Sequence, residues 1–218
     1  MLIAGVDEAG RGPAIGPMVL AVAVIDSDSE SSLRDLGARD SKEVPVEERE
    51  RLYPLLQGVL SAHGTVHINA PEMDALMDRV SLNEIEAMKI GSLLNGLSEK
   101  PKVVFVDSPD PVADHFGRRI QNYLSYSPKI VAEHKADVNY PIVSAASILA
   151  KVQRDAVIKE LQGAFSMFGD IGSGYSHDER TIGFLKRYLE LHNALPSCAR
   201  QKWATNIRLM DSRYQTRL

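Results

Sequence analysis

Two apolar runs near the start of the chain, residues 2–6 (LIAGV) and 18–25 (MVLAVAVI), constrain the fold most strongly. Both are short and apolar, and the second is β-branched, which predicts buried strands. The Gly/Pro-rich segment Gly10 to Pro17 between them is too short for the crossover that parallel strands need. We therefore predict that the two strands pair antiparallel as a hairpin.

Two carboxylates, Asp7 and Glu8, follow the first run, and a glycine-arginine-glycine turn at residues 10–12 comes next. Successive side chains of a regular strand point to opposite faces, so the pair can serve one site only if the strand ends or bends here. Glycines allow such a bend. Taken alone, the pair is better explained as a strand that runs into a solvated turn.

Gly10, Gly12 and Gly16 also resemble the phosphate-binding loop of dinucleotide-binding proteins. That loop must open a helix, whereas Pro13, Pro17 and a β-rich run follow here. The pattern therefore disfavours a nucleotide-binding oxidoreductase.

The remaining pattern predicts an α/β fold with a mixed five-stranded sheet flanked by helices. We expect one domain over residues 1–218, with a sheet core over about residues 1–175 and a helical C-terminal lobe over about 176–218. The expected strands after the hairpin are 64–69, 102–106 and 129–132, and residues 26–32 are expected to be a polar loop. The expected helices are 46–62, 70–97 with a break near Ser81, 111–126, 141–162, 177–193 and 198–210.

Charge is unevenly distributed along the chain, although the net charge is only −4. Residues 1–50 hold eleven Asp and Glu against five Lys and Arg, a balance of −6. Residues 178–218 hold eight Lys and Arg against four Asp and Glu, a balance of +4. An acidic centre beside a basic arm fits metal ions and a phosphate backbone, although uneven surface charge is also common.

The chain has one cysteine, Cys198, which favours a reducing, cytoplasmic location. The opening residues lack the basic and apolar regions of a signal peptide, and no apolar run reaches membrane-spanning length. We expect neither a membrane partner nor an internal disulfide.

Two more carboxylates occupy comparable places, Asp107 at the end of the run 103–106 and Asp137 just before the long helix. Carboxylates at the ends of neighbouring strands can converge, and they then repel one another unless cations neutralise them. Oxygen ligands without a His/Cys cluster favour Mg²⁺ or Mn²⁺. Two such ions ~3.5–4 Å apart are a device for phosphodiester hydrolysis.

Other polar residues nearby have simpler interpretations. Asp110 and Asp114 are expected to be helix-start or solvent residues. His134 is a candidate ligand, although a single His without a partner is more often structural or a proton carrier. Lys42 and Lys135 are either functional or ordinary surface charge.

Six stretches together resemble the type 2 ribonuclease H family, ribonuclease HII, in its archaeal form. They are GVDEAGRGP (5–13), DSK (40–42), VFVDSP (104–109), EHKAD (133–137), YPIVSAASILAKVQRD (140–155) and GSGY (172–175). The resemblance implies an RNase H-like fold and a metal-dependent endoribonuclease that cuts RNA in RNA–DNA hybrids. It further implies cleavage at single ribonucleotides in duplex DNA, on their 5′ side, leaving 3′-hydroxyl and 5′-phosphate ends.

The same resemblance assigns roles to individual residues. The four metal-binding, catalytic carboxylates map onto Asp7, Glu8, Asp107 and Asp137, which would bind two Mg²⁺ or Mn²⁺ ions. The ribose-sensing motif maps onto Gly10, Arg11 and Gly12, and the junction-sensing tyrosine onto Tyr175. Lys42, Lys151 and Arg154 are candidate phosphate contacts, with ordinary surface charge as their alternative.

The expected binding partners follow from the same resemblance. We expect a monomer that binds RNA–DNA hybrids and ribonucleotide-containing DNA. The last residues, 214–218, lack the pattern of sliding-clamp ligands, which leaves a clamp partner open. A related metal nuclease on the same fold and a non-catalytic nucleic-acid-binding module remain as alternatives. The first has no use for Gly-Arg-Gly, and the second needs no converging carboxylates.

Overall fold

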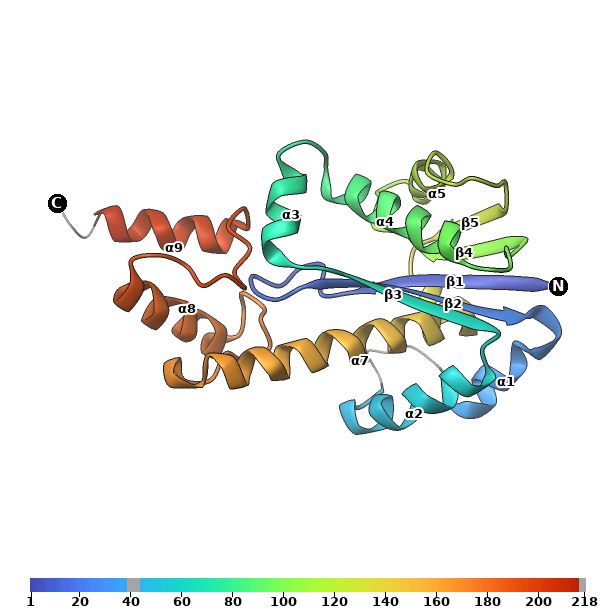
Figure 1. Ribbon diagram of the computed structural model, residues 1–218, viewed down its shortest axis with the longest axis horizontal. Coiled ribbons are helices and arrows are strands. Elements are labelled where there is room, and N and C mark those ends of the chain that lie inside the picture. Colours follow the sequence, from blue (N-terminus) through green and yellow to red (C-terminus); the bar gives the residue numbers. More distant parts are fainter. Residues whose placement is uncertain (39–43, 216–218) are drawn as a thin grey trace. The chain divides into compact units, whose positions relative to one another are not determined.

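The computed structural model describes residues 1–38 and 44–215, with side chains as far as residue 212. Its centre is a five-stranded sheet in the order β3-β2-β1-β4-β5 (Figure 1). β1 pairs antiparallel with β2 and parallel with β4, and β4 pairs parallel with β5, so the predicted hairpin and mixed sheet are confirmed. The strands are β1 (Leu2–Ala9), β2 (Met18–Asp26), β3 (Ala62–Ile68), β4 (Val103–Asp107) and β5 (Lys129–Glu133).

The helices largely follow the predicted pattern, and their ends have local causes. Asn69 and Ser81 each accept a hydrogen bond from the amide three residues later, and these caps begin α3 and α4 as two separate helices. The expected helix 111–126 is shorter, and the expected polar loop 26–32 runs into a short helix, α1. The helices are α1 (Ser31–Leu36), α2 (Val46–Val59), α3 (Ala70–Met77), α4 (Leu82–Gly96), α5 (Ala113–Gln121), α6 (Ala136–Asn139), α7 (Pro141–Ala164), α8 (Glu179–His192) and α9 (Ala204–Gln215).

The chain divides into two compact units, each assembled from separate segments. The first unit contains Met1–Ala9, Val19–His67 and Ser81–Gln153. The second contains Gly10–Met18, Ile68–Val80 and Arg154–Leu218. The hairpin turn therefore belongs with the C-terminal part of the chain, not with the two strands that it joins.

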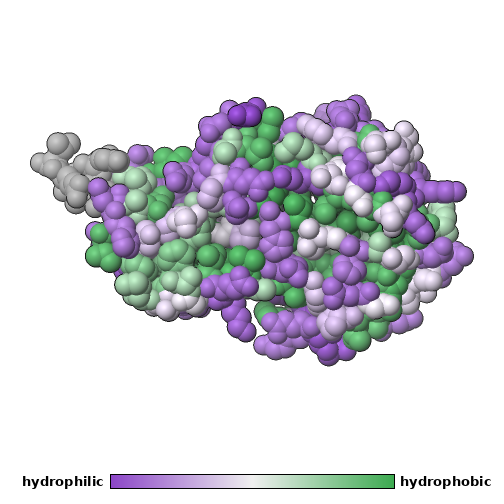
Figure 2. All heavy atoms as spheres, in the orientation of Figure 1, coloured by the Kyte–Doolittle hydropathy of each residue, from purple (hydrophilic) through white to green (hydrophobic). Residues whose placement is uncertain are grey.

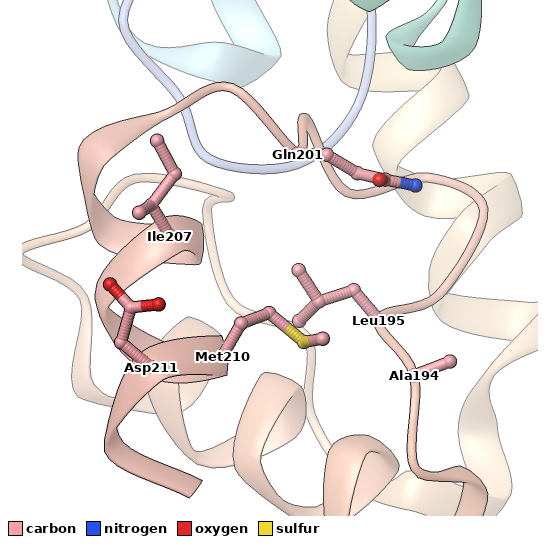
Figure 3. Close-up of a pocket in the computed structure, with 6 residues that line it drawn as sticks. All are labelled: Ala194, Leu195, Gln201, Ile207, Met210 and Asp211. Atoms are coloured by element: carbon pink, nitrogen blue, oxygen red, sulfur yellow. The ribbon is translucent and has the colours of Figure 1, made fainter. Parts of the chain in front are cut away.

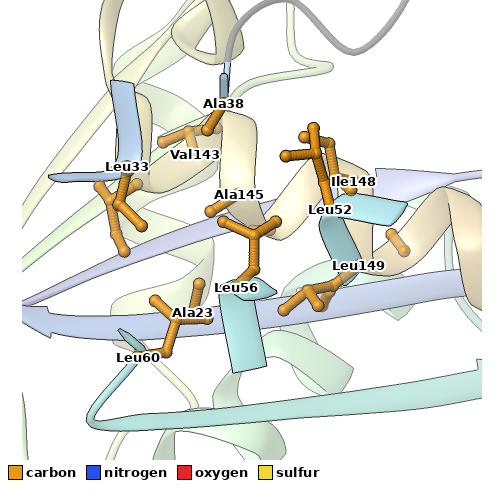
Figure 4. Close-up of a cluster of buried hydrophobic side chains, with 14 of the residues drawn as sticks. Ala23, Leu33, Ala38, Leu52, Leu56, Leu60, Val143, Ala145, Ile148 and Leu149 are labelled. Carbon is orange, nitrogen blue, oxygen red and sulfur yellow. The ribbon is translucent and has the colours of Figure 1, made fainter. Parts of the chain in front are cut away.

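The core of the first unit lies between one face of the sheet and the helices α1, α2 and α7 (Figure 4). Ile3 of β1 and Val19, Ala21 and Ala23 of β2 supply the sheet side, in the alternation expected of a strand. Helices α4 and α5 cover the other face (Figure 1). The sheet is thus buried on both faces, which explains the uninterrupted apolar runs in β1 and β2.

The second unit has a smaller core of its own. Ala14 and Ile15 pack with Phe184 and Leu185 of α8, and Phe168 also belongs to this cluster. These contacts attach residues from the start of the chain to helices near its end.

None of the described helices is both long and apolar enough to cross a membrane. On the face shown in Figure 2, hydrophilic and hydrophobic residues are mixed.

Candidate active site

Adjacent parallel strands bring two of the expected carboxylates together in the first unit. Val6 of β1 is in register with Val106 of β4, so Asp7 and Asp107 occupy the next position on each strand. β1 continues through both residues to Ala9, so the strand does not end at the acidic pair, but the charge of Glu8 still acts on the Asp7 carboxyl. Asp7 is only 6% exposed, whereas its neighbour Glu8 is partly exposed.

The electrostatics of Asp7 indicate a cluster of negative charge. Burial, and after it the charges of Glu8 and Asp107, raise the pKa of the Asp7 carboxyl well above its usual range. Hydrogen bonds from the Ser147 hydroxyl and from the Glu8 amide, the latter 2.8 Å long, act in the opposite direction. A bound cation would relieve this repulsion.

Asp107 connects the end of β4 to the segment that carries Asp137. Its Oδ1 accepts a hydrogen bond of 2.9 Å from the amide of Ala136 at the start of α6. Asp137 lies in this short helix and is 2% exposed, and its carbonyl accepts a 2.5 Å bond from Ser144 of α7. The left-handed backbone of Lys135, with φ of 58°, makes the turn between β5 and α6.

His134 also joins the loops that follow β4 and β5. Its Nε2 lies 2.8 Å from the carbonyl oxygen of Asp110. The structural role considered for this residue is therefore supported, because the contact holds the two acidic loops together. Its sequence neighbours Glu133 and Lys135 gave no indication of this contact.

The expectation that Asp110 is a helix-start or solvent residue is wrong. Asp110 is 5% exposed and accepts hydrogen bonds from Arg119, at 3.0 Å, and from Asn83. Arg119 also binds Glu84 at 2.7 Å. Hydrogen bonds from Tyr123 and then Arg119 lower the pKa of the Glu84 carboxyl. This network holds the loop immediately after Asp107, whereas Asp114 is exposed as expected.

Lys151, a candidate phosphate contact, belongs to the same unit. Its Nζ lies 3.4 Å from the hydroxyl of Ser147, the residue that also binds Asp7. Lys151 therefore lies close to the acidic cluster and is partly buried in α7. Lys42 lies outside the described residues.

The donor set fits Mg²⁺ or Mn²⁺, because it consists of carboxylates whose mutual repulsion a cation would relieve. Within the described part of the chain, no three His, Cys, Asp or Glu side chains form a ready-made metal shell. The residues that could hold a metal are Asp7, Glu8, Asp107 and Asp137.

The second unit contains the glycine loop, which we define as residues 10–16. Gly10 has φ of 78°, and a Cβ there would lie 2.7 Å from the carbonyl oxygen of Pro17, so no larger residue fits. A Cβ on Gly12 would lie 3.7 Å from Cε1 of Tyr175. The two expected substrate-sensing elements are therefore neighbours within this unit.

Tyr175 lies in the tyrosine loop, residues 172–175, which Arg154 supports. Arg154 is 7% exposed, donates a 2.5 Å bond to the carbonyl of Ser173, and pairs with Asp155 at 3.3 Å. Its guanidinium lies 5.4 Å from the centre of the Tyr175 ring. These contacts favour a supporting role for Arg154, while its phosphate contact stays a prediction.

Several basic residues of the C-terminal segment are already engaged. Arg200 belongs to the basic arm that the charge pattern associates with a phosphate backbone, but it is fully buried and so is not available for such a contact at the surface. Arg180 pairs with Asp178 at 2.8 Å, and Lys202 pairs with Asp78. Buried Cys198 has a pKa raised to about 12 by burial, which makes it unreactive.

A pocket of about 270 Å³ lies in the second unit, between residues 194–201 and α9 (Figure 3). Leu195, Ile207 and Met210 line it together with the polar residues Gln201 and Asp211. One carboxylate in a largely apolar lining does not provide the chemistry of a hydrolytic site.

Comparisons with known proteins point to one family. The family model described as Ribonuclease HII matches residues 4–206. Ribonuclease HII of Pyrococcus furiosus is 41% identical over 212 residues, which cover 97% of this chain and 92% of the relative. The crystal structure of ribonuclease H2 from Pyrococcus horikoshii OT3 is similar with a TM-score of 0.90 at 42% identity, covering 97% of this chain and 98% of the other. The structure of the PCNA:RNase HII complex from Archaeoglobus fulgidus is similar with a TM-score of 0.82 at 36% identity, covering 93% and 95%.

Proposed function

The chain belongs to the ribonuclease HII family and is an endoribonuclease that acts on RNA–DNA hybrids, and we propose that it also cuts at single ribonucleotides embedded in duplex DNA. In this proposal the cut falls on the 5′ side of the ribonucleotide and leaves a 3′-hydroxyl and a 5′-phosphate. The raised pKa of Asp7, produced by burial and by Glu8 and Asp107, is the observation that best supports a hydrolytic site here.

We assign Asp7, Glu8, Asp107 and Asp137 as the residues that hold two Mg²⁺ or Mn²⁺ ions. When bound, such ions supply activation of the attacking water and stabilisation of the leaving oxygen. The protein holds these residues in place through three neighbours: Ser147 binds Asp7, while Ala136 and His134 join the loops after β4 and β5. Lys151, beside Ser147, is suited to attract a phosphate towards the acidic cluster.

We assign recognition of the ribonucleotide to Gly10, Arg11, Gly12 and Tyr175. Only RNA has a 2′-hydroxyl, and a glycine backbone can approach that group without interference from a Cβ. The ring of Tyr175 can stack on the deoxyribose after the cut, where a 2′-hydroxyl would clash. The proximity of Gly12 to Tyr175 supports a single recognition surface for the ribonucleotide and the junction.

The decisive experiment compares three duplexes of one sequence: all-DNA, DNA with one ribonucleotide, and a full RNA–DNA hybrid. We expect cleavage of the second and third in Mg²⁺ and in Mn²⁺, with the cut 5′ to the single ribonucleotide. Mass analysis of the products identifies the two ends. Cleavage of the all-DNA duplex at a similar rate would instead support a nuclease without ribose recognition.

The relative from Archaeoglobus fulgidus forms a complex with PCNA. A sliding clamp as a partner of this chain is part of the proposal, although residues 214–218 lack the pattern of clamp ligands. Co-elution with a sliding clamp in gel filtration would support it. Separate elution at micromolar concentrations would leave nucleic acid as the only proposed partner.

A further inference from the structure

Arg200 is a fully buried arginine whose guanidinium reaches back to the glycine loop. Its Nη2 donates a 2.5 Å hydrogen bond to the carbonyl of Gly10, and its Nη1 donates one of 2.8 Å to that of Arg11. Its Nε donates a third, of 2.9 Å, to the carbonyl of Gly16. One side chain thus fixes both ends of the glycine loop.

Trp203 extends this arrangement to the next residue of the loop. Its Nε1 donates a 3.2 Å hydrogen bond to the carbonyl of Gly12. The guanidinium carbon of Arg200 lies 4.7 Å from the centre of the Trp203 ring, so the two side chains are stacked. The carbonyls of three consecutive residues, Gly10, Arg11 and Gly12, are therefore all bound by one stacked pair.

The backbone around Arg200 is itself fixed to the loop. The amide of Gly16 donates to the carbonyl of Cys198 at 2.9 Å, and the amide of Arg200 donates to that of Ala14 at 2.9 Å. Asn206, which is fully buried, donates to the same Ala14 carbonyl at 2.8 Å. The segment 198–206 thus holds Arg200 in a single position relative to the loop.

A buried guanidinium is costly unless its donors are satisfied, so its presence calls for an explanation beyond filling space. The planar fork of arginine suits several carbonyls at fixed positions better than any other side chain does. RNA and DNA differ here by one hydroxyl, and a site discriminates on one hydrogen-bonding group only when its own groups are rigidly placed.

We propose that Arg200 and Trp203 are positioning residues that set the shape of the glycine loop for recognition of the 2′-hydroxyl. The inference rests on the ribose-sensing role proposed above for that loop. With their carbonyls bound to this pair, Gly10, Arg11 and Gly12 are held in one backbone shape against the ribose. Neither Arg200 nor Trp203 needs to contact the nucleic acid.

The test uses two conservative variants of the full chain, Arg200→Lys and Trp203→Phe. Lysine keeps a hydrogen-bond donor at the end of a long side chain but lacks the fork, and phenylalanine keeps the ring but lacks the N–H donor. The matched control is Arg187→Lys, because Arg187 donates a 2.5 Å bond to the carbonyl of Phe168 in the same unit but outside the loop. Urea unfolding of each variant establishes the folded fraction.

The readout is the ratio of dissociation constants for an all-DNA duplex and for the same duplex with one ribonucleotide, measured by fluorescence anisotropy with Ca²⁺ in place of Mg²⁺. We expect about a tenfold or greater loss of this ratio for Arg200→Lys, and roughly threefold or more for Trp203→Phe. Binding of the all-DNA duplex should stay unchanged. A merely structural role would lower the folded fraction without changing the ratio.

Unchanged ratios in folded Arg200→Lys and Trp203→Phe would overturn the inference, as would an equal loss in Arg187→Lys. Trp203→Phe alone decides the question if Arg200→Lys does not fold. If the wild type itself binds the two duplexes with a ratio of dissociation constants near one, the ribose-sensing role of the loop is wrong, and this inference fails with it. The two failures are therefore distinguishable.

Discussion

Gly5, in the middle of β1, has no room for any side chain. A Cβ at this position would lie 2.3 Å from both the carbonyl carbon and the oxygen of Ile142, and 2.6 Å from the amide nitrogen of Val143. All three are backbone atoms in the first turn of α7, so no change of side-chain rotamer can relieve the clash. We predict that Gly5→Ala separates α7 from the sheet.

The size of the effect follows from these distances. Ordinary van der Waals contact begins at 3.4 Å, so the helix must move about 1.1 Å away from the strand. Overpacking of this kind costs about 1–3 kcal/mol, and a clash with fixed backbone should lie at the upper end, about 3 kcal/mol. For a chain of this length, the melting temperature should fall by about 6–12 °C.

The same displacement should reach the candidate active site. Ser147, which binds Asp7, lies on α7 a little more than one turn after Ile142. We expect Gly5→Ala to reduce hybrid cleavage even at temperatures where the variant is fully folded. The Mg²⁺ concentration needed for half-maximal activity should rise at the same time, because Asp7 is no longer held in position.

Gly58→Ala is the matched control for the thermal and urea unfolding measurements. A Cβ at Gly58 would meet nothing within 4 Å, and the residue lies inside α2. This substitution should be neutral or stabilise the protein by up to about 1 kcal/mol. Wild-type stability and activity in Gly5→Ala would refute the packing of β1 against α7 described above.

Four further predictions concern individual side chains. Asp7→Asn should abolish cleavage, and wild-type turnover in this variant would contradict the assignment of Asp7. In EDTA at pH 7 the same variant should unfold at a higher urea concentration than the wild type. The reason is that the pKa of Asp7 is raised in the folded protein, so its carboxylate destabilises the fold at any pH above the unfolded-state pKa. Asp178, whose pKa is lowered first by the Arg180 side chain and then by the Ser173 amide, stabilises the protein above about pH 4. Asp178→Ala should therefore lower the free energy of unfolding by about 1 kcal/mol at pH 7, a difference that shrinks as the pH falls below 4. Tyr175→Ala should lose about one to two decades of activity on a single embedded ribonucleotide and less on a long hybrid, and Tyr175→Phe should lose less than Tyr175→Ala. Equal losses on the two substrates would indicate a structural role for Tyr175. Lys186 and Arg208 are exposed, and reversing their charges should make the dependence of log affinity on log salt concentration less steep. The slope should fall by about 0.9 for each phosphate that the protein no longer neutralises. An unchanged slope would show that neither residue belongs to the binding surface.

Local pattern was sufficient to predict the sheet and the place of Asp107 at the end of a strand. The hairpin follows from the short link between two apolar runs, and Asp107 ends β4 as its apolar run indicates. These features depend on neighbours within a few residues, which the sequence displays directly. The expected roles of the site residues stay predictions that the experiments above address.

Residues whose surroundings come from distant parts of the chain could not be predicted. Asp110 precedes a helix and resembles a solvent residue, but it binds Arg119 of that helix and Asn83, which is 27 positions away. Arg200 contributes to a basic segment and resembles a surface charge, but its partners lie near the start of the chain. Periodicity and charge counts do not reveal whether a polar residue faces water or a distant backbone.

The sequence separation between Arg200 and Gly10 has a consequence for the order in which parts of the chain fold during synthesis. They are 190 positions apart, so the ribosome completes most of the protein between making one partner and making the other. The glycine loop leaves the ribosome early, but the side chains that bind its carbonyls do not yet exist. Contacts this far apart in sequence carry a large loop-closure entropy, so we expect them to form late in folding. A nascent chain is thus expected to complete its sheet before the glycine loop acquires the shape that we propose for recognition of the 2′-hydroxyl.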